Sequence, residues 1–488
     1  MKIIVSAKWI AFLEDLLKAN SKPVILYALG FEAPEAFFVG YFAQCSDQCT
    51  SDSEFQEGKD ELTGINSSAL GIGGYNRQQE PSEGSAARAN GPELPDENSL
   101  YSRARQLLRL LPGGIDICGI MLVSCGVETT AWESSAIRVA KRLRKLRDRH
   151  VMLKNDASLL TKHLFIATVC DSLENFNSQL ISFVNKDVQA HPGPALAVQD
   201  ILWCSLQTKV AVNVSSSCGG SVFGVDFLRR FVDLVDPYGQ RFLNSHVLVD
   251  GRLPSDHKSI YLSNLMHREN GLVVPLQAKF LLSSSDERMI AELEYNDVTC
   301  ARMRLTGVLA IRAFVPSVCT IEEGVTALRK DVLRTLYIRG ELHYEERLVT
   351  GAENEANSYR GLPRRVFASL GSPGECFDVC EYIMHDEDLS FLQNEVGDFF
   401  RADMDPSNVE LNAEPLMTVQ EDVFPSSPQS VNTFSLCERI FGYNVSYLIQ
   451  GTLSLCDEVS PKTFRILALA FVPLILFWLF GLLRMPKY

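Results

Sequence analysis

The sequence predicts an α+β body followed by a single membrane-spanning helix. Apolar runs of strand length, some of them alternating with polar residues, recur between residues 24 and 384. One long segment instead carries Val325, Leu328, Val332 and Leu336 at helical spacing. Close to the C-terminus, residues 466–483 contain no charged side chain and are long enough to cross the hydrocarbon of a bilayer.

Composition bounds the class of protein. A chain of 488 residues has room for two or three folded units, and 46% apolar with 22% charged residues is a globular balance. The net charge of −14 argues against a nucleic-acid partner, because phosphate binding draws on clustered Lys and Arg. The 13 cysteines are dispersed and form no CxxC pair, so we expect free thiols in a reducing compartment.

We expect the first domain to consist of residues 1–45 and 100–190. A helix at 9–17 precedes two strands, 24–31 and 37–43, that are predicted to form a hairpin. Residues 46–99 are rich in Ser, Gly, Glu and Asn and are predicted to be a disordered insertion. The elements expected after the insertion are an amphipathic stretch at 100–111, a Pro-Gly-Gly turn, a buried strand at 115–124, a helix at 130–149 and strands at 164–170 and 180–184.

The second domain, residues 195–400, is predicted to mix strands with a long helix. Alternation makes residues 303–315 one long strand, which leads into a helix at 321–343. The other elements expected are strands at 203–214, 245–250, 273–282, 290–294, 365–370 and 377–384, and a short helix at 389–400. Residues 401–461 are mostly polar and acidic, and we expect them to form a tether.

The tether leads to the predicted membrane anchor at residues 466–483. Basic residues flank this segment on both sides, and Pro473 kinks a spanning helix without forbidding it. The N-terminus lacks the apolar core of a signal peptide, so we expect insertion after translation, with the bulk of the chain in the cytosol. The residues that mark the anchor are Ile466, Phe471, Pro473, Trp478 and Leu483.

Motifs for catalysis are scarce. The eight histidines include no HxH or HxxxH pair, and neither a nucleophile elbow nor a phosphate-binding loop occurs, so no enzyme, metal or cofactor is predicted. A hydrolase built around Cys125 or Cys118 is the open alternative, because Cys125 lies between a buried strand and a helix start. A further alternative is binding to anionic membranes through the basic end of helix 130–149.

Five short segments carry a family resemblance. Residues 104–119 contain Arg105, Gln106, Pro112, Gly113, Gly114 and Gly119, and this run is similar to the signature of the ODR-4 family. Four later segments match in the same order, and they include Trp203, the run 312–315, Lys330 with Asp331, and Pro363 with Arg365 and Val366. Together with the C-terminal apolar segment, the resemblance covers residues 24–483.

The resemblance implies a function. ODR-4 proteins are factors of the endoplasmic-reticulum membrane associated with the folding or trafficking of G-protein-coupled receptors. In animals they are also associated with recruiting the ubiquitin-fold-modifier protease to that membrane. The resemblance therefore implies a non-catalytic adaptor with protein partners, anchored by one C-terminal span.

The first domain also looks like a degenerate MPN fold. In that fold a strand ending in glycine is followed by a metal-binding His-x-His, whereas here Gly119 is followed by a run without histidine. This implies an inactive domain that pairs with a partner. The chain departs from the family in its long insertion after Cys45, its extended start and its cysteine-rich strand.

Overall fold

The structure, a computed structural model, describes residues 1–19, 22–45, 96–124, 129–150, 162–184, 187–218, 227–253, 255, 258–269, 272–282, 301–350, 359–371, 376–384, 396–400 and 408–423. Met1–Val423 form one compact unit, and Phe424–Tyr488, which include the predicted anchor, lie outside the described residues. Among the described residues, no helix is long and apolar enough to span a membrane. The mixed α and β content agrees with the predicted fold class.

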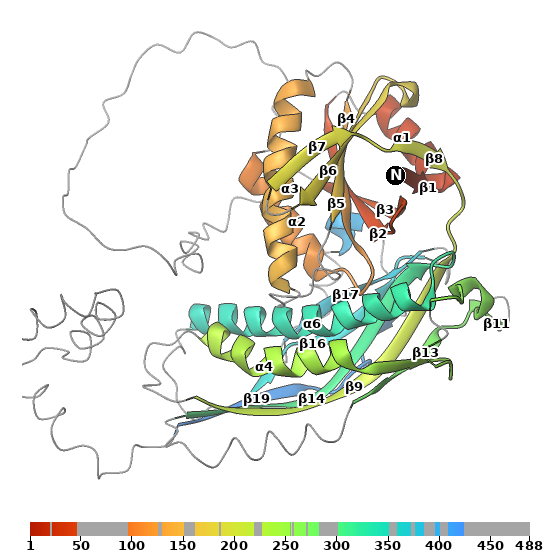
Figure 1. The fold of residues 1–488 in the computed structure, drawn as a ribbon. Coiled ribbons are helices and arrows are strands. Elements are labelled where there is room, and N and C mark those ends of the chain that lie inside the picture. The colour runs from red at the N-terminus through yellow and green to blue at the C-terminus, as the bar shows by residue number, and fades with distance from the viewer. Residues whose placement is uncertain are drawn as a thin grey trace, which may run out of the picture. The chain divides into compact units, whose positions relative to one another are not determined.

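The first sheet contains eight strands and is built around a hairpin (Figure 1). β2 and β3 pair antiparallel, which confirms the predicted hairpin, and β4 joins β2 antiparallel and β5 parallel. β1 lies parallel between β3 and β8. In sheet order the strands are β7 (Asp187–Pro192), β6 (Phe176–Val184), β5 (His163–Cys170), β4 (Asp116–Ser124), β2 (Val24–Glu32), β3 (Ala36–Cys45), β1 (Lys2–Val5) and β8 (Ala195–Val198).

Helices cover both faces of this sheet. α1 (Ala7–Ala19) buries Leu13 and Leu16 against one face, whereas α2 (Glu97–Arg109) and α3 (Thr129–His150) pack on the other. Asp96 caps α2 by accepting a hydrogen bond from Asn98 N at 3.2 Å, so α2 begins inside the range 46–99 that was predicted as the insertion. The rest of the predicted insertion, 46–95, lies outside the described residues.

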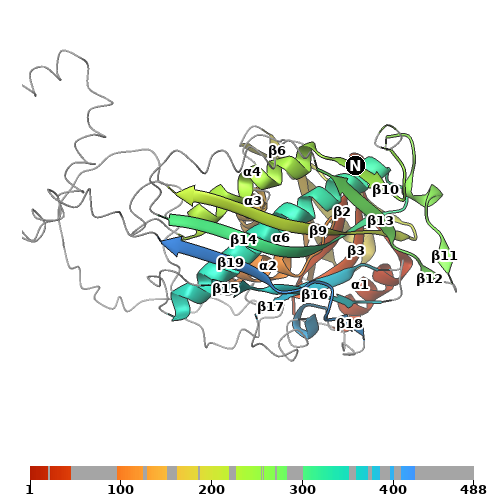
Figure 2. The same cartoon turned by 90° about the horizontal axis from the view of Figure 1, so that it is seen from below.

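The second sheet is dominated by two 16-residue strands that pair antiparallel over their whole length, from Ala301 opposite Cys218 to Pro316 opposite Trp203. Figure 2 shows these strands beside β19. β14 confirms the predicted long strand and extends it at both ends. In sheet order the strands are β10 (His246–Val249), β13 (Leu276–Leu281), β9 (Trp203–Cys218), β14 (Ala301–Pro316), β19 (Met417–Val423) and β15 (Tyr359–Leu362).

Two helices lie along one face of the second sheet (Figure 1). α6 (Ile321–Thr350) begins where predicted and runs seven residues further than expected. α4 (Phe227–Asn244) was not predicted, although it buries Phe231, Leu234 and Phe242. Two small sheets complete the unit, one of β17 (Asp378–Ile383), β16 (Arg364–Ser369) and β18 (Val409–Glu410), the other of β11 (Arg268–Glu269) and β12 (Leu272–Val273).

The structure corrects two predicted boundaries. The tether was expected to begin at residue 401, but β18 and β19 lie inside the folded unit, and β19 pairs with both β14 and β15. Its alternating Met417 and Val419 are buried in the main apolar core, which is why a segment of polar composition belongs to a sheet. β8, assigned by sequence to the second domain, pairs with β1 in the first sheet.

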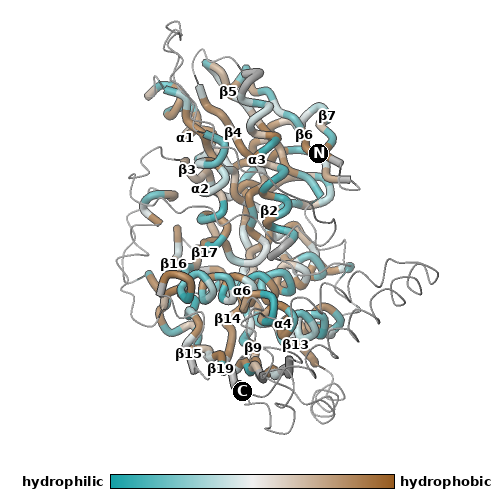
Figure 3. The backbone as a smooth tube through the Cα atoms, turned by 90° about the vertical axis from the view of Figure 1, so that its left-hand side faces the viewer, coloured by the Kyte–Doolittle hydropathy of each residue, from teal (hydrophilic) through white to brown (hydrophobic). Residues whose placement is uncertain are grey.

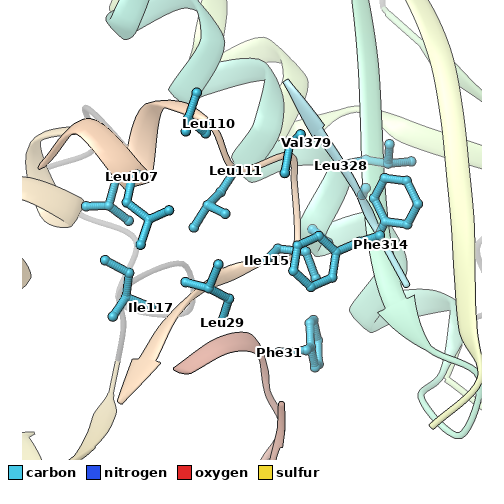
Figure 4. Packing of buried hydrophobic residues seen from close by; sticks show 14 of the residues in the cluster. Leu29, Phe31, Leu107, Leu110, Leu111, Ile115, Ile117, Phe314, Leu328 and Val379 are labelled. Carbon is cyan, nitrogen blue, oxygen red and sulfur yellow. The ribbon is translucent and has the colours of Figure 1, made fainter. Parts of the chain in front are cut away.

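One apolar core runs through both sheets. Figure 4 shows Leu29, Phe31 and Ile117 of the first sheet beside Phe314 of β14 and Leu328 of α6. Leu107, Leu110, Leu111 and Ile115, from α2 and the following turn, lie in the same cluster. Figure 3 colours much of β4 and β14 as hydrophobic, in keeping with their burial. The two sheets are therefore fused into one body.

Candidate functional site

The family motif after α2 forms a turn that joins the two sheets, and we call residues 110–115 the junction turn. Gly113 makes a parallel bridge with Ala313 of β14. Gly113 N donates to Arg312 O at 2.9 Å, and Phe314 N donates to Gly113 O at 2.8 Å. The junction turn thus adds a short pairing to β14, and β4 of the first sheet follows directly.

Both glycines of the junction turn are required by close approach. Gly114 has φ +79°, and a Cβ there would lie 2.3 Å from Phe314 O. A Cβ on Gly113 would lie 2.7 Å from Asp331 Cβ and 2.8 Å from Ala327 O. Since most of these obstacles are backbone atoms or atoms next to the backbone, larger residues would force the sheets apart.

Beneath the junction turn, Asp331 of α6 and Arg365 of β16 form a fully buried ion pair. Arg365 Nη1 and Nη2 donate to the two carboxylate oxygens of Asp331 at 2.7 and 3.0 Å. Burial opposes the charge, but Asp331 outweighs it and keeps the pKa of the Arg365 guanidinium well above its usual value. Asp331 also accepts from Arg312 N at 3.1 Å, so one carboxylate holds α6, β14 and β16 together.

A second buried pair, between Arg339 and Glu414, fixes the segment before β19. The Glu414 carboxylate accepts from Arg339 Nη2, from Ala310 N at 2.8 Å and from Arg365 N at 2.5 Å. Arg339 Nη1 donates to Pro363 O at 2.8 Å. Glu414 therefore replaces missing backbone partners on two strands.

Sequence reasoning missed this second pair, because Glu414 was assigned to the tether. A signal was present in α6, where the apolar stripe that includes Val332 and Leu336 continues onto Arg339 at helical spacing. A charge on the buried stripe of a helix indicates a buried partner.

α2 is joined to α6 by a partly exposed charge network. Arg105 Nη2 lies 2.8 Å from Glu341 and 2.7 Å from Glu345. Arg109 Nη2 lies 3.1 and 2.8 Å from the same two carboxylates, which outweigh burial and raise the pKa of the Arg109 guanidinium. Gln106, beside them in the motif, accepts from Arg103 Nη1 at 3.4 Å.

The remaining motif residues take structural positions. Arg334 Nη1 donates to the carbonyls of Leu111, Pro112 and Ile115, at 3.2, 3.5 and 3.2 Å, so α6 caps the junction turn. Lys330 is partly buried on α6, one turn before Arg334. Val366 is buried in β16, and buried Trp203 at the start of β9 makes an edge contact with Phe377.

Gly119 lies in the middle of β4, inside the buried strand predicted at 115–124. A Cβ here would lie 2.4 Å from the ring of Phe165 on β5. The glycine therefore makes room for an aromatic ring in the core. Within the described residues, no group of three or more His, Cys, Asp or Glu side chains is placed to hold a metal.

Of the two candidate nucleophilic cysteines, only Cys118 lies among the described residues. Cys118 is buried on β4, and burial raises the pKa of its thiol well above the usual range, which keeps it protonated and poorly nucleophilic. Cys125 lies outside the described residues. Among the described side chains, no disulfide joins Cys45, Cys118, Cys170, Cys204, Cys319, Cys376 or Cys380.

The basic end of α3 is largely occupied by contacts within the protein. Arg138 pairs with Glu97 at 2.6 Å, Arg142 stacks on Tyr101, and Arg144 pairs with Asp148 at 3.4 Å. Arg147 is buried against Asp116, whereas Lys141 and Lys145 are exposed and take part in none of these contacts. This pairing lessens the case for lipid binding through α3.

Comparison with known proteins agrees with the motif. Residues 71–411 match the family described as ODR4-like, Odorant response abnormal 4-like, and this range includes strands of both sheets. The chain belongs to the ODR4-like family. Protein odr-4 homolog of Mus musculus is 22% identical over 65% of this chain and 71% of that protein. Odorant response abnormal protein 4 of Caenorhabditis elegans is 22% identical over 56% of this chain and 57% of that protein.

Among solved structures, the ODR4-like chain is similar to UfSP from C. elegans, with 10% identity and a TM-score of 0.36, over 82% of this chain and 56% of that one.

Proposed function

We propose that this ODR4-like chain is a non-catalytic adaptor. In this proposal a C-terminal span anchors the body to the cytosolic face of the endoplasmic reticulum. There the body assists the localisation of membrane proteins of the G-protein-coupled-receptor type. It also recruits a cytosolic protein partner, such as a ubiquitin-fold-modifier protease.

The observation that carries the proposal is the place of the family motif in the fold. Gly113, Asp331 and Arg365 lie buried and Gly114 lies half-buried where the two sheets meet, and none of them presents a reactive group to solvent. Residues shared with the family signature thus build a rigid two-sheet body. A rigid body offers fixed surfaces to partners, which is what an adaptor needs.

The proposed class of client follows from the relatives. One of them is named for an abnormal odorant response, and the detection of odorants depends on membrane receptors. The proposed location follows from residues 466–483, an uncharged segment with the length of a membrane span. Together they support the proposal that the folded body acts beside membrane-protein clients.

The test compares three forms of the chain in cells: full-length, truncated before residue 464, and full-length with residues 466–483 replaced by an unrelated apolar span. Proteins that co-purify with each body are identified after membrane fractionation. We expect the truncated body and its partners to leave the membrane fraction, and the exchanged span to restore both. Partners that stay on the membrane without the span would overturn the recruiting role.

A further inference from the structure

The end of α6 that lies farthest from the junction turn carries exposed apolar side chains. Apart from Glu322 in the first turn, the exposed residues of α6 among those described are Leu348 and Val349 in the last turn. Leu348 is 43% exposed and Val349 is 72% exposed, the largest value for a big apolar side chain in the described part of the body. Single apolar residues are common on protein surfaces, but an adjacent pair at the end of a largely buried helix indicates a contact outside the body.

The last turn of α6 lies level with the first residues of β14. A Cβ on Gly324, in the first turn of α6, would lie 3.1 Å from Leu206, and Leu206 pairs with Ala313 of β14. From Gly324 to Val349 the helix rises about 38 Å at 1.5 Å per residue. From Ala313 back to Ala301 the strand covers about 41 Å at 3.4 Å per residue. Both elements therefore reach the same end of the second sheet, as Figure 1 shows for α6 and β14.

The chain leaves the described body at this same end. Val423, the last described residue, pairs with Ala301 of β14. The chain continues from Val423 to residues 466–483, the uncharged segment of the proposed anchor. A bilayer that holds the anchor is therefore tethered to this end of the body and not to the opposite end of β14, about 50 Å away. Tethering raises the effective concentration of lipid at the end that carries the exposed pair.

The charges at this end do not select anionic lipids. Residues 346–350 of α6, 301–304 of β14 and 420–423 of β19 contain as many acidic as basic side chains. These charged residues are Glu346, Arg347, Arg302, Arg304, Glu421 and Asp422. The surface thus offers apolar contact without an excess of positive charge, which distinguishes it from the basic end of α3.

We propose that this end of the body lies on the surface of the bilayer, with Leu348 and Val349 in the apolar part of the interface. The inference rests on the proposed C-terminal anchor and deepens it, because it names the surface of the body that faces lipid. The contact is apolar, so it does not require anionic lipids. The opposite end, where α6 begins, then faces the cytosol.

The test uses the full-length chain with the photo-reactive amino acid p-benzoylphenylalanine at one position. The chain is reconstituted in phosphatidylcholine vesicles that contain a trace of alkyne-labelled phosphatidylcholine. Val349 is the test position. Val318 is the matched control, because it is a valine that is 50% exposed and lies just beyond Pro316, at the opposite end of β14.

After irradiation, the lipid adduct is measured as alkyne label per protein. We expect at least about fivefold more adduct at position 349 than at position 318, because an apolar side chain in the interface is surrounded by lipid. Replacing part of the phosphatidylcholine by phosphatidylserine should change the adduct at position 349 by less than about twofold, since the contact carries no excess of positive charge.

Two further variants, made in the chain with the photo-reactive residue at position 349, test the role of the apolar pair. Leu348→Asp brings a charge into the interface and should lower the lipid adduct by about fivefold or more. Leu253→Asp is the matched control and should leave the adduct unchanged. Leu253 is 60% exposed and follows the turn after β10, toward the start of β9. Circular dichroism confirms that both variants are folded.

Three outcomes would overturn the inference: equal adducts at positions 349 and 318, an adduct at 349 that Leu348→Asp leaves unchanged, or an adduct that forms only with phosphatidylserine. Flotation of the same vesicles separates these outcomes from failure of the proposed function. A chain that floats with the vesicles but gives equal adducts keeps its anchor and loses only the inferred surface. A chain that does not float lacks the anchor, and both proposals fail.

Discussion

α6 carries two sets of ion pairs that differ in burial. On one side, Asp331 and Arg339 pair with Arg365 and Glu414, all with fully buried side chains. On the other side, Glu341 and Glu345 pair with arginines of α2, and the most exposed member, Arg105, is 38% accessible. The same helix thus holds the second sheet with fully buried charges and α2 of the first sheet with partly exposed ones.

This difference in burial gives the two sets of ion pairs different roles: the buried pairs determine how the elements are arranged, and the partly exposed pairs add stability. A buried charge is tolerated only with its partner in place, so the buried pairs allow one arrangement of α6, β14 and β16. Charges that remain near water lose little free energy when they are separated. The α2 network therefore adds some stability but does not determine how α2 and α6 are arranged. The following predictions test how far this contrast extends.

The largest effect is expected at the buried pair. Asp331→Ala leaves the Arg365 guanidinium buried without its carboxylate and should lower the free energy of unfolding by about 3–5 kcal/mol. Urea denaturation followed by circular dichroism measures the change. Adding Arg365→Met should recover part of the loss, since the unpaired charge is removed. A loss below about 1 kcal/mol for Asp331→Ala would mean that the buried pair stabilises the protein no more than the partly exposed α2 network does.

Gly114→Ala is expected to have the next largest effect, about 2–4 kcal/mol, because it combines a left-handed backbone with a methyl group 2.3 Å from Phe314 O. Gly251→Ala is a matched control. Gly251 has φ +75° but no atom within 4 Å of the added methyl, so it should cost only the backbone term, about 1–2 kcal/mol. Equal losses in thermal unfolding would mean that the junction turn is not tightly packed.

The pH dependence should differ between two carboxylates. Burial would raise the pKa of Asp116, but Arg147 and Arg334 hold it below its ordinary value. Its stabilising effect is therefore complete above about pH 4 and is lost as the pH falls through the lowered pKa. Asp116→Asn should cost about 2 kcal/mol near pH 7, and the cost should shrink toward pH 3.

The pKa of Asp378 is shifted in the opposite direction to that of Asp116. Its burial outweighs the attraction of Arg312 and raises the pKa, so its contribution is greatest below about pH 4 and is lost as the pH rises through the raised pKa. Asp378→Asn should therefore gain stability relative to the unmodified chain between pH 4 and 7. Melting temperatures of both variants, measured from pH 3 to 7, test these expectations. If the melting temperatures of the two variants change with pH in the same way, both pKa directions are wrong.

The smallest effect is expected in the α2 network. Arg105→Ala should cost about 0.5–1 kcal/mol in low salt, because Arg109 keeps both carboxylates paired. In 1 M NaCl the loss should almost disappear, since salt screens exposed charges. A loss above about 2 kcal/mol that persists in high salt would place this network with the buried pairs.

Local patterns predicted much of the fold. The hairpin of β2 and β3, the long strand β14 and the start of α6 follow from alternation and helical spacing, which depend on neighbouring residues. α4 was not found, because Pro237 and Gly239 lie inside it and normally mark turns. β19 was not found, because only contacts with distant strands turn its polar segment into a sheet strand.

The site was harder to predict. Gly114, Asp331 and Arg365 were selected by family resemblance, and nothing in their spacing pairs Asp331 with a residue 34 positions away. The Arg339–Glu414 pair spans 75 positions. Such long-range pairs are chosen by tertiary packing, which a single sequence does not encode locally.

The position of β19 has a consequence for synthesis on the ribosome. β19 lies between β14 and β15, yet it is the last strand of the described body to be translated. β15 is made earlier but has no partner in its sheet until β19 arrives, so the sheet cannot close while residues 417–423 are still inside the exit tunnel. Closure then depends on contacts far apart in sequence, which are slow to form. Folding of the body and exit of the C-terminal segment therefore fall in the same interval, when chaperones that hold the nascent chain have their greatest influence.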